Sequence, residues 1–573
     1  MKFTDMEERD QNQLFILFLA IFIFSFALVL LEFNKQQSYT SYQKIQFENA
    51  GTTLYANLYF PAKDLEFQQK QPLVIYVHGL ASDRNFDIRF PIELTKRGFF
   101  VASIDYHGHG ESGGTIFDIN LNTGRLAIVD DVAVLLDFLE KLPVFQERIN
   151  SSQIGLVGHS LGGMISLLNN VYDSRINATV VLNPLVNYGV IVHPTFENNM
   201  PVDILNETNT QNLLLIAHVN DTTLDYKQHA LIAHQLTKAP LINFSKPVSG
   251  SPHLLMNNEV DVITINWLEN VFFNSDTKNG PIVISYLFNY LFLGTNLLIL
   301  IFIMFLLISL SSNLFSLTPK IESEEIILKE FDSPKLKKIH QILILIGSVV
   351  IFLFVWITFS RVFQLLGIYY ASFTLLGIYA LAYLGSHLYK LHQKNEKFSF
   401  SYIMSAAKGR LKSQLHIGCM MYGFLASGIF QALYVALSVS YPFAFVWPTN
   451  TRSIIFGFTA LPIFLAVEIF YRKIVYPRLR FIKRESLRTK AQIILAIIVQ
   501  FMIFLNTTLW TALPALTVSY LIILVVIIIN TLIYEKTKRA IVRIIFSLDV
   551  IFFFFGAAIS TALGIDIAIY LFI

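Results

Sequence analysis

The chain has 573 residues, of which 54% are hydrophobic and 14% charged, and its 43 basic and 40 acidic side chains give a formal net charge of +3. Ordinary soluble domains carry about 25% charged residues, so this composition excludes a wholly soluble protein, a disordered one and a nucleic-acid-binding one. The single cysteine, Cys419, excludes a disulfide within the chain.

Apolar residues are distributed unevenly along the chain. Residues 36–280 have the mixed composition of a soluble domain, whereas an apolar run precedes them and nearly everything after residue 283 is apolar. We therefore predict a cytoplasmic N-terminus over 1–13, a transmembrane anchor over 14–33, a globular domain over 36–280 and an all-α polytopic membrane domain over 285–573. Acidic residues before the first apolar run favour a retained anchor over a cleaved signal peptide.

Nine segments are long and apolar enough to cross a bilayer, which takes about 20 residues. They are 14–31, 288–312, 341–360, 362–388, 415–440, 453–471, 491–511, 515–533 and 544–564. Asp566, among the apolar residues at the C-terminus, leaves open whether the last segment crosses completely.

Basic residues mark one side of the predicted membrane domain. The loops 313–340, 389–414, 472–490 and 534–543, taken with the N-terminus, hold 25 Lys and Arg residues, and the alternate loops hold only Arg361 and Arg452. Cytoplasmic loops carry the excess of positive charge. This distribution predicts a cytoplasmic N-terminus and a globular domain that lies outside the cell membrane.

A glycine-flanked serine follows a short apolar strand in the globular domain. The strand, 154–157, runs into Gly158-His159-Ser160-Leu161-Gly162, and a helical pattern follows. G-x-S-x-G between a strand and a helix is the setting in which a tight turn presents a nucleophilic serine. Side chains in place of the two glycines would collide with the neighbouring strand and helix.

Other strands of the domain also end in polar, glycine-rich segments. The apolar strand 73–77 ends in His78-Gly79-Leu80, and the strand 99–104 ends in the segment 105–113. Helical patterns, one of them over 129–139, lie between the strands. Alternating strands and helices predict a parallel sheet with helices on both faces.

With these segments, the domain resembles the α/β-hydrolase superfamily, and within it the serine-aminopeptidase and monoacylglycerol-lipase-like group. The resemblance covers about residues 43–270. It rests on His78-Gly79, on Asp105 to Ser112 with Gly108-His109-Gly110 inside, and on the segment 158–163. His107 departs from the pattern, because relatives usually have Arg there. The resemblance implies a doubly wound, mostly parallel α/β-hydrolase sheet.

The catalytic residues expected after Ser160 follow in the chain order of α/β-hydrolases, which is Ser, acid, His. The strand 213–216 leads to Asp221, with Asp225 as the alternative acid, and the strand 241–244 leads to His253. We predict that His253 accepts the proton of Ser160 and that Asp221 orients the imidazole.

The oxyanion that forms on attack needs two N–H donors, which we assign to the backbone of Leu80 and Leu161. The other histidines of these segments, and His234 within a helical pattern, are interpreted as packing or loop-ordering residues: His78, His107, His109, His159. We predict no cofactor and no metal site.

The segment 183–211 stands where such enzymes place a lid over the active site. It is short, which predicts an open cleft. Its apolar residues either cover an acyl group or pack on the core.

These features favour a membrane-bound serine hydrolase that cleaves an ester, amide or peptide bond through an acyl-enzyme, with its active site on the outer face. Spans on both sides of the domain hold it near the outer leaflet, so membrane lipids are expected partners and a lipid or acyl ester is the favoured substrate. Two alternatives stay open. One is an acyltransferase, and the other is a transporter or receptor-like protein with a non-catalytic, hydrolase-like sensing domain.

Overall fold

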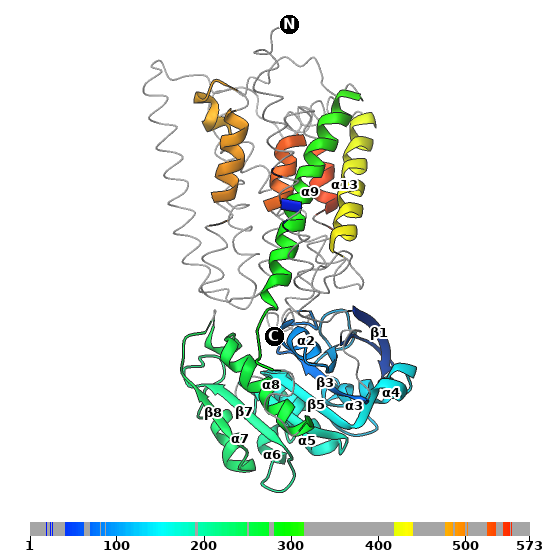
Figure 1. The fold of residues 1–573 in the computed structure, drawn as a ribbon, viewed down its shortest axis with the longest axis vertical. Coiled ribbons are helices and arrows are strands. Elements are labelled where there is room, and N and C mark those ends of the chain that lie inside the picture. Colours follow the sequence, from blue (N-terminus) through cyan, green and yellow to red (C-terminus); the bar gives the residue numbers. More distant parts are fainter. Residues whose placement is uncertain are drawn as a thin grey trace, which may run out of the picture.

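The computed structural model describes most of the predicted globular domain and parts of the apolar region that follows it (Figure 1). The described ranges are 41–61, 69–80, 82–85, 87–188, 193–248, 251–273, 280–314, 417–438, 476–484, 487–498, 524–533 and 542–550. Residues 19, 23, 24, 26, 501 and 552 are described singly.

Eight strands form one sheet, in the order β1-β2-β4-β3-β5-β6-β7-β8. Their bounds are β1 Ser41–Asn49, β2 Thr52–Phe60, β3 Gln71–Val77, β4 Phe100–Asp105, β5 Ile149–His159, β6 Ile176–Leu182, β7 Leu213–His218 and β8 Leu241–Phe244. Strands β3 to β8 pair in parallel, and β2 pairs antiparallel with both β1 and β4. The predicted α/β-hydrolase type of sheet, mostly parallel, is confirmed.

The hairpin of β1 and β2 extends the sheet at its β4 side. Its two strands are joined by Ala50 and Gly51, which both have positive φ angles, 49° and 79°. A two-residue loop with two positive φ angles matches the right-handed twist of the flanking strands. No strand was expected over 41–60 from the sequence pattern, so this antiparallel part of the sheet is an addition to the expected architecture.

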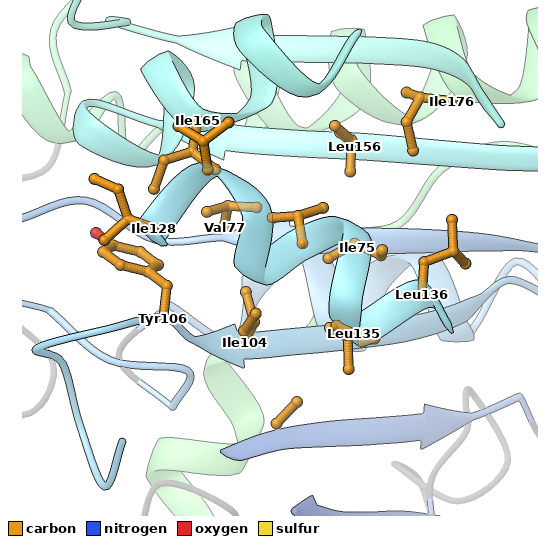
Figure 2. Close-up of a cluster of buried hydrophobic side chains, with 14 of the residues drawn as sticks. Ile75, Val77, Ile104, Tyr106, Ile128, Leu135, Leu136, Leu156, Ile165 and Ile176 are labelled. Atoms are coloured by element: carbon orange, nitrogen blue, oxygen red, sulfur yellow. The ribbon is translucent and has the colours of Figure 1, made fainter. Parts of the chain in front are cut away.

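Helices cover both faces of the sheet. They are α2 Arg89–Thr95, α3 Ala127–Leu139, α4 Pro143–Arg148, α5 Leu161–Tyr172, α6 Pro201–Ile204, α7 Ala230–Thr237 and α8 Asn258–Phe273. The same domain contains the 3-10 turns η1 Pro194–Phe196 and η2 Pro252–Leu254, and a further 3-10 turn, η4 Tyr476–Phe481, lies in the apolar region after it. Successive side chains of a strand point to opposite faces. In β3, Ile75 and Val77 pack with α3 and α5, as Figure 2 shows, whereas Val74 and Tyr76 pack with α2 and α8.

Two of the described helices are long and apolar enough to span a bilayer. The candidate spans are Leu287–Ile308, within α9 (Leu287–Leu314), and Ile417–Ala436, within α13 (Ile417–Ser438). They coincide with the predicted spans 288–312 and 415–440. The predicted spans 341–360, 362–388 and 453–471 lie outside the described residues, and 14–31, 491–511, 515–533 and 544–564 are described only in part.

Helix α2 holds the chain where it leaves the globular domain and enters α9. Glu93 accepts hydrogen bonds from the backbone N–H groups of Ser285 (2.7 Å) and Tyr286 (2.6 Å), immediately before α9 begins. Lys96 donates to the same Glu93 and to the hydroxyl of Ser285. These buried contacts explain why α9 begins beside α2 in Figure 1.

A buried ion pair adds to this junction. The guanidinium of Arg97 donates to both carboxylate oxygens of Glu269 on α8, each at 2.7 Å, and also to the carbonyl of Gly280. Glu269 is fully buried. Breaking a buried pair by removing one charge costs about 3–5 kcal/mol, because the other charge stays buried without compensation.

We therefore predict that Glu269→Gln lowers the free energy of unfolding of the globular domain by about 3 kcal/mol. Glu259→Gln, on the same helix, removes the exposed pair with Lys246 and costs about 1 kcal/mol or less. Urea unfolding of the detergent-solubilised full chain measures both values. Equal losses in the two variants contradict a stabilising role of the buried pair.

Candidate active site

Ser160 lies in a sharp turn between β5 and α5. Its backbone has φ 55° and ψ −116°, a conformation that an L-residue adopts only when its surroundings enforce it. A Cβ atom on Gly158 would lie 2.3 Å from the carbonyl oxygen of Gly162, and one on Gly162 would lie 2.1 Å from that of Val77. Both glycines are thus required by the close approach of helix and strand.

The three predicted triad residues lie in one hydrogen-bonded series. The Nε2 atom of His253 is 3.0 Å from the Oγ atom of Ser160, and its Nδ1 atom is 2.6 Å from Oδ2 of Asp221. His253 sits in the turn η2, and Asp221 follows the end of β7. The loops therefore bring together residues that are 93 and 32 positions apart in the chain.

The carboxylate of Asp221 is stabilised in its ionised form. Burial raises the pKa of this group, but the hydrogen bond to His253, the charge of that ring and two backbone N–H groups more than offset the effect, so that the pKa of Asp221 lies below its ordinary value. The two N–H groups belong to Thr223 (2.8 Å) and Leu224 (3.2 Å). An ionised carboxylate accepts the hydrogen on Nδ1 of His253. The other ring nitrogen, Nε2, is then the one that faces the Oγ atom of Ser160.

The alternative acid, Asp225, is placed differently. It is exposed, and its Oδ1 atom accepts hydrogen bonds from the backbone N–H groups of Lys227 and Gln228. These local bonds close a turn that Asp225 itself begins. The structure thus brings Asp221, and not Asp225, to His253.

The two predicted oxyanion donors come from segments that lie next to the nucleophile. Leu161 is the first residue of α5, so its N–H is one of the groups that a helix N-terminus leaves without an intrahelical partner. Leu80 follows Gly79, at which a Cβ atom would lie 3.1 Å from the Cβ atom of Ser160. Within the described part of the chain, neither Leu80 nor Leu161 donates its N–H to another group.

Two histidines beside the nucleophile are poorly suited to proton transfer. Burial lowers the pKa of His78 and of His159 to about 3, so both rings are neutral at ordinary pH. His78 stacks on Tyr106, and its Nδ1 atom is 2.8 Å from the carbonyl of Gly79. This environment agrees with the interpretation of His78 as a packing group.

His107, the departure from the pattern of relatives, is held by a carboxylate. Its Nδ1 atom is 2.8 Å and 2.9 Å from the two oxygens of Asp131, which also accepts the backbone N–H of His107. Burial acts against protonation, but the bond to Asp131 raises the pKa of His107 overall.

Among the described residues, no group of three or more His, Cys, Asp or Glu side chains is arranged to hold a metal ion.

The lid segment contributes mainly to the core. Leu185 and Val186 are buried in the hydrophobic clusters of the domain, whereas Tyr188 is exposed. Residues 189–192, which include the apolar Val190, lie outside the described residues.

Two buried side chains near His253, those of Asn183 and Arg89, were not singled out in the sequence. An Asn at a strand end and an Arg in a short helix are both common, so neither is a signal of a functional site.

The fold agrees with comparisons with known proteins. Residues 72–237 match the profile of a protein family described as alpha/beta hydrolase fold. The putative esterase YitV of Bacillus subtilis (strain 168) is 29% identical over 132 residues, which cover 22% of this chain and 48% of that protein. The lysophosphatidylserine lipase ABHD12 of Danio rerio is 30% identical over 108 residues, which cover 18% of this chain and 25% of that protein.

Among solved structures, the acylaminoacyl peptidase of Pyrococcus horikoshii aligns with 42% of this chain and 43% of its own, with 15% identity and a TM-score of 0.33. The chain spans between 25% and 48% of the length of the curated relatives that it matches. The family profile and the sheet topology together show that this chain contains a domain of the alpha/beta hydrolase fold.

Proposed function

We propose that this chain is a membrane-bound serine hydrolase that cleaves an ester, or an amide or peptide, bond through an acyl-enzyme on Ser160. The observation that carries the proposal is the hydrogen-bonded series from Ser160 through His253 to Asp221 at the strained turn of an alpha/beta hydrolase fold. A serine hydroxyl is a weak nucleophile unless a positioned base accepts its proton, and Nε2 of His253 is within reach to do so.

The reaction then follows in two halves. The Oγ atom of Ser160 attacks the carbonyl carbon while His253 takes the proton, and the N–H groups of Leu80 and Leu161 stabilise the oxyanion. The protonated His253 gives its proton to the leaving group as the tetrahedral intermediate collapses to the acyl-enzyme. A water molecule, deprotonated by His253, attacks the acyl carbon and releases the acid, so that Ser160 recovers its proton.

The proposed membrane location favours a lipid or acyl ester as the substrate. The candidate span within α9 begins directly after the globular domain, which holds the start of that helix through Glu93. The names of two relatives, an esterase and a lysophosphatidylserine lipase, point to ester bonds and to lipids. The charge distribution of the predicted loops favours a polytopic membrane domain with the active site on the outer face.

Labelling of intact cells with a membrane-impermeant fluorophosphonate tests the nucleophile and its location together. We expect the wild-type chain to be labelled and Ser160→Ala to lose all labelling, because the probe phosphonylates only an activated serine. Labelling that depends on Ser160 but occurs only after lysis contradicts the external location. The absence of labelling in both states, with folded protein present, contradicts the proposed hydrolase.

Replacement of the two candidate acids distinguishes their roles. We expect Asp221→Asn to lower kcat for p-nitrophenyl butyrate by about 10³–10⁴-fold, because the amide disfavours the imidazole tautomer that accepts the serine proton. Asp225→Asn is the matched control, four residues away and exposed, and is expected to leave kcat within about 2-fold. The opposite order of the two effects contradicts the assignment of Asp221.

A further inference from the structure

Four consecutive backbone carbonyls around His253 accept hydrogen bonds from buried side chains. The carbonyls are those of residues 252–255, in and just after the turn η2. This segment contains a single short turn and ends at Leu255 with a φ of 49°. A segment without a strand or helix ladder depends on such side-chain contacts for a defined position.

Asn183 joins this segment to the one that carries the acid. Its Nδ2 atom donates to the carbonyls of Pro252 (3.0 Å) and His253 (2.8 Å), and its Oδ1 atom accepts the backbone N–H of His218 at 2.8 Å. His218 is the last residue of β7, three positions before Asp221. Asn183 is 3% exposed, so water does not compete for these bonds.

Two further side chains complete the set. Nε2 of His159 is 2.8 Å from the carbonyl oxygen of His253, and this contact requires the hydrogen of the neutral ring to be on Nε2. Arg89 donates to the carbonyls of Leu255 (3.0 Å) and, at a longer 3.4 Å, Leu254.

The guanidinium of Arg89 is itself held in place by two carboxylates. Asp87 accepts from both Nε and Nη2, and Asp261 of α8 accepts from Nη1 at 3.1 Å. Arg89 is 1% exposed and Asp87 is 4% exposed. A buried, fully paired guanidinium is a rigid donor, which suits it to fix a backbone segment.

We infer that Asn183, His159 and Arg89 are positioning residues, which hold the imidazole of His253 between Ser160 and Asp221 through the backbone carbonyls of 252–255. The inference rests on the proposed function. The residues come from three places in the fold: the end of β6, the end of β5 and the start of α2. Together they restrain the segment 252–255 from several sides. Asn183 also sets the distance between this segment and the one that carries Asp221.

The positioning role predicts a loss in the chemical step, with little loss in substrate binding. The proton acceptor must stay within hydrogen-bond reach of Ser160, and a misplacement of about 1 Å can cost about 100-fold in rate. A residue that only stabilised the fold would lower the melting temperature without changing kcat of the folded protein.

The first test compares two asparagines in the detergent-solubilised full chain. Asn183 and Asn212 both have a φ of 42°, and the Nδ2 atom of each donates to backbone carbonyls, that of Asn212 to Asn177 away from the site. Replacement by Ala therefore adds similar backbone strain in both. We expect Asn183→Ala to lower kcat for p-nitrophenyl butyrate by about 10–100-fold with KM within about 2-fold, and Asn212→Ala to leave both close to wild type.

The second test uses a conservative rescue at His159. Gln carries an N–H donor that can reach the carbonyl of His253, whereas Phe carries none. We expect His159→Gln to keep kcat within about 3-fold of wild type and His159→Phe to lose about 10-fold or more. This pair decides the inference if Asn183→Ala fails to fold.

The outcomes separate this inference from the proposed function. Full kcat in a folded Asn183→Ala variant, or equal kcat in His159→Gln and His159→Phe, overturns the positioning role while Ser160→Ala still abolishes turnover. Turnover that survives Ser160→Ala overturns the proposed function instead. Losses of kcat in Asn183→Ala and His159→Phe, with Asn212→Ala and His159→Gln near wild type, support the inference.

Discussion

The close approach of α5 to β3 is the constraint on which the candidate site depends. Gly162, in the first turn of α5, lies against the carbonyl oxygens of Val77 and His78, so near that one added carbon atom would overlap both. This approach places the N-terminus of α5 beside the segment that carries Leu80. The strained turn of Ser160 and the backbone of Leu80, which we predict to be an oxyanion donor together with Leu161, thereby come together from parts of the chain that are distant in sequence.

Buried polar contacts then connect the segments that follow the strand ends. A parallel sheet aligns its strands but does not hydrogen-bond the segments beyond them. Asn183 connects the segments of His218 and His253, and Arg89 reaches the same region from α2. The other end of α2 holds the start of α9 through Glu93. One short helix therefore contacts both the segment that carries His253 and the residues that lead directly into the candidate span of α9.

The sheet and its hairpin differ in how far they follow from the sequence. The buried strands β3 and β7 and the second half of β5 are short apolar runs bounded by glycine or polar residues, a pattern that predicts parallel strands. The hairpin β1–β2 carries mixed polar and apolar residues, and its Ala50-Gly51 loop is a weak turn signal. Its place in the sheet is set by the pairing of β2 with β4, which only the folded chain provides.

The sequence by itself determined the strand–turn–helix around Ser160, because the need for Gly158 and Gly162 arises from steric contacts that this local geometry always creates. It also restricted the acid to Asp221 or Asp225. Only the tertiary structure shows which of the two lies at His253, since this depends on which carboxylate reaches that ring and which is satisfied by its own turn. The support of that ring by Asn183 was decided in the same way, because packing of the sheet sets those distances.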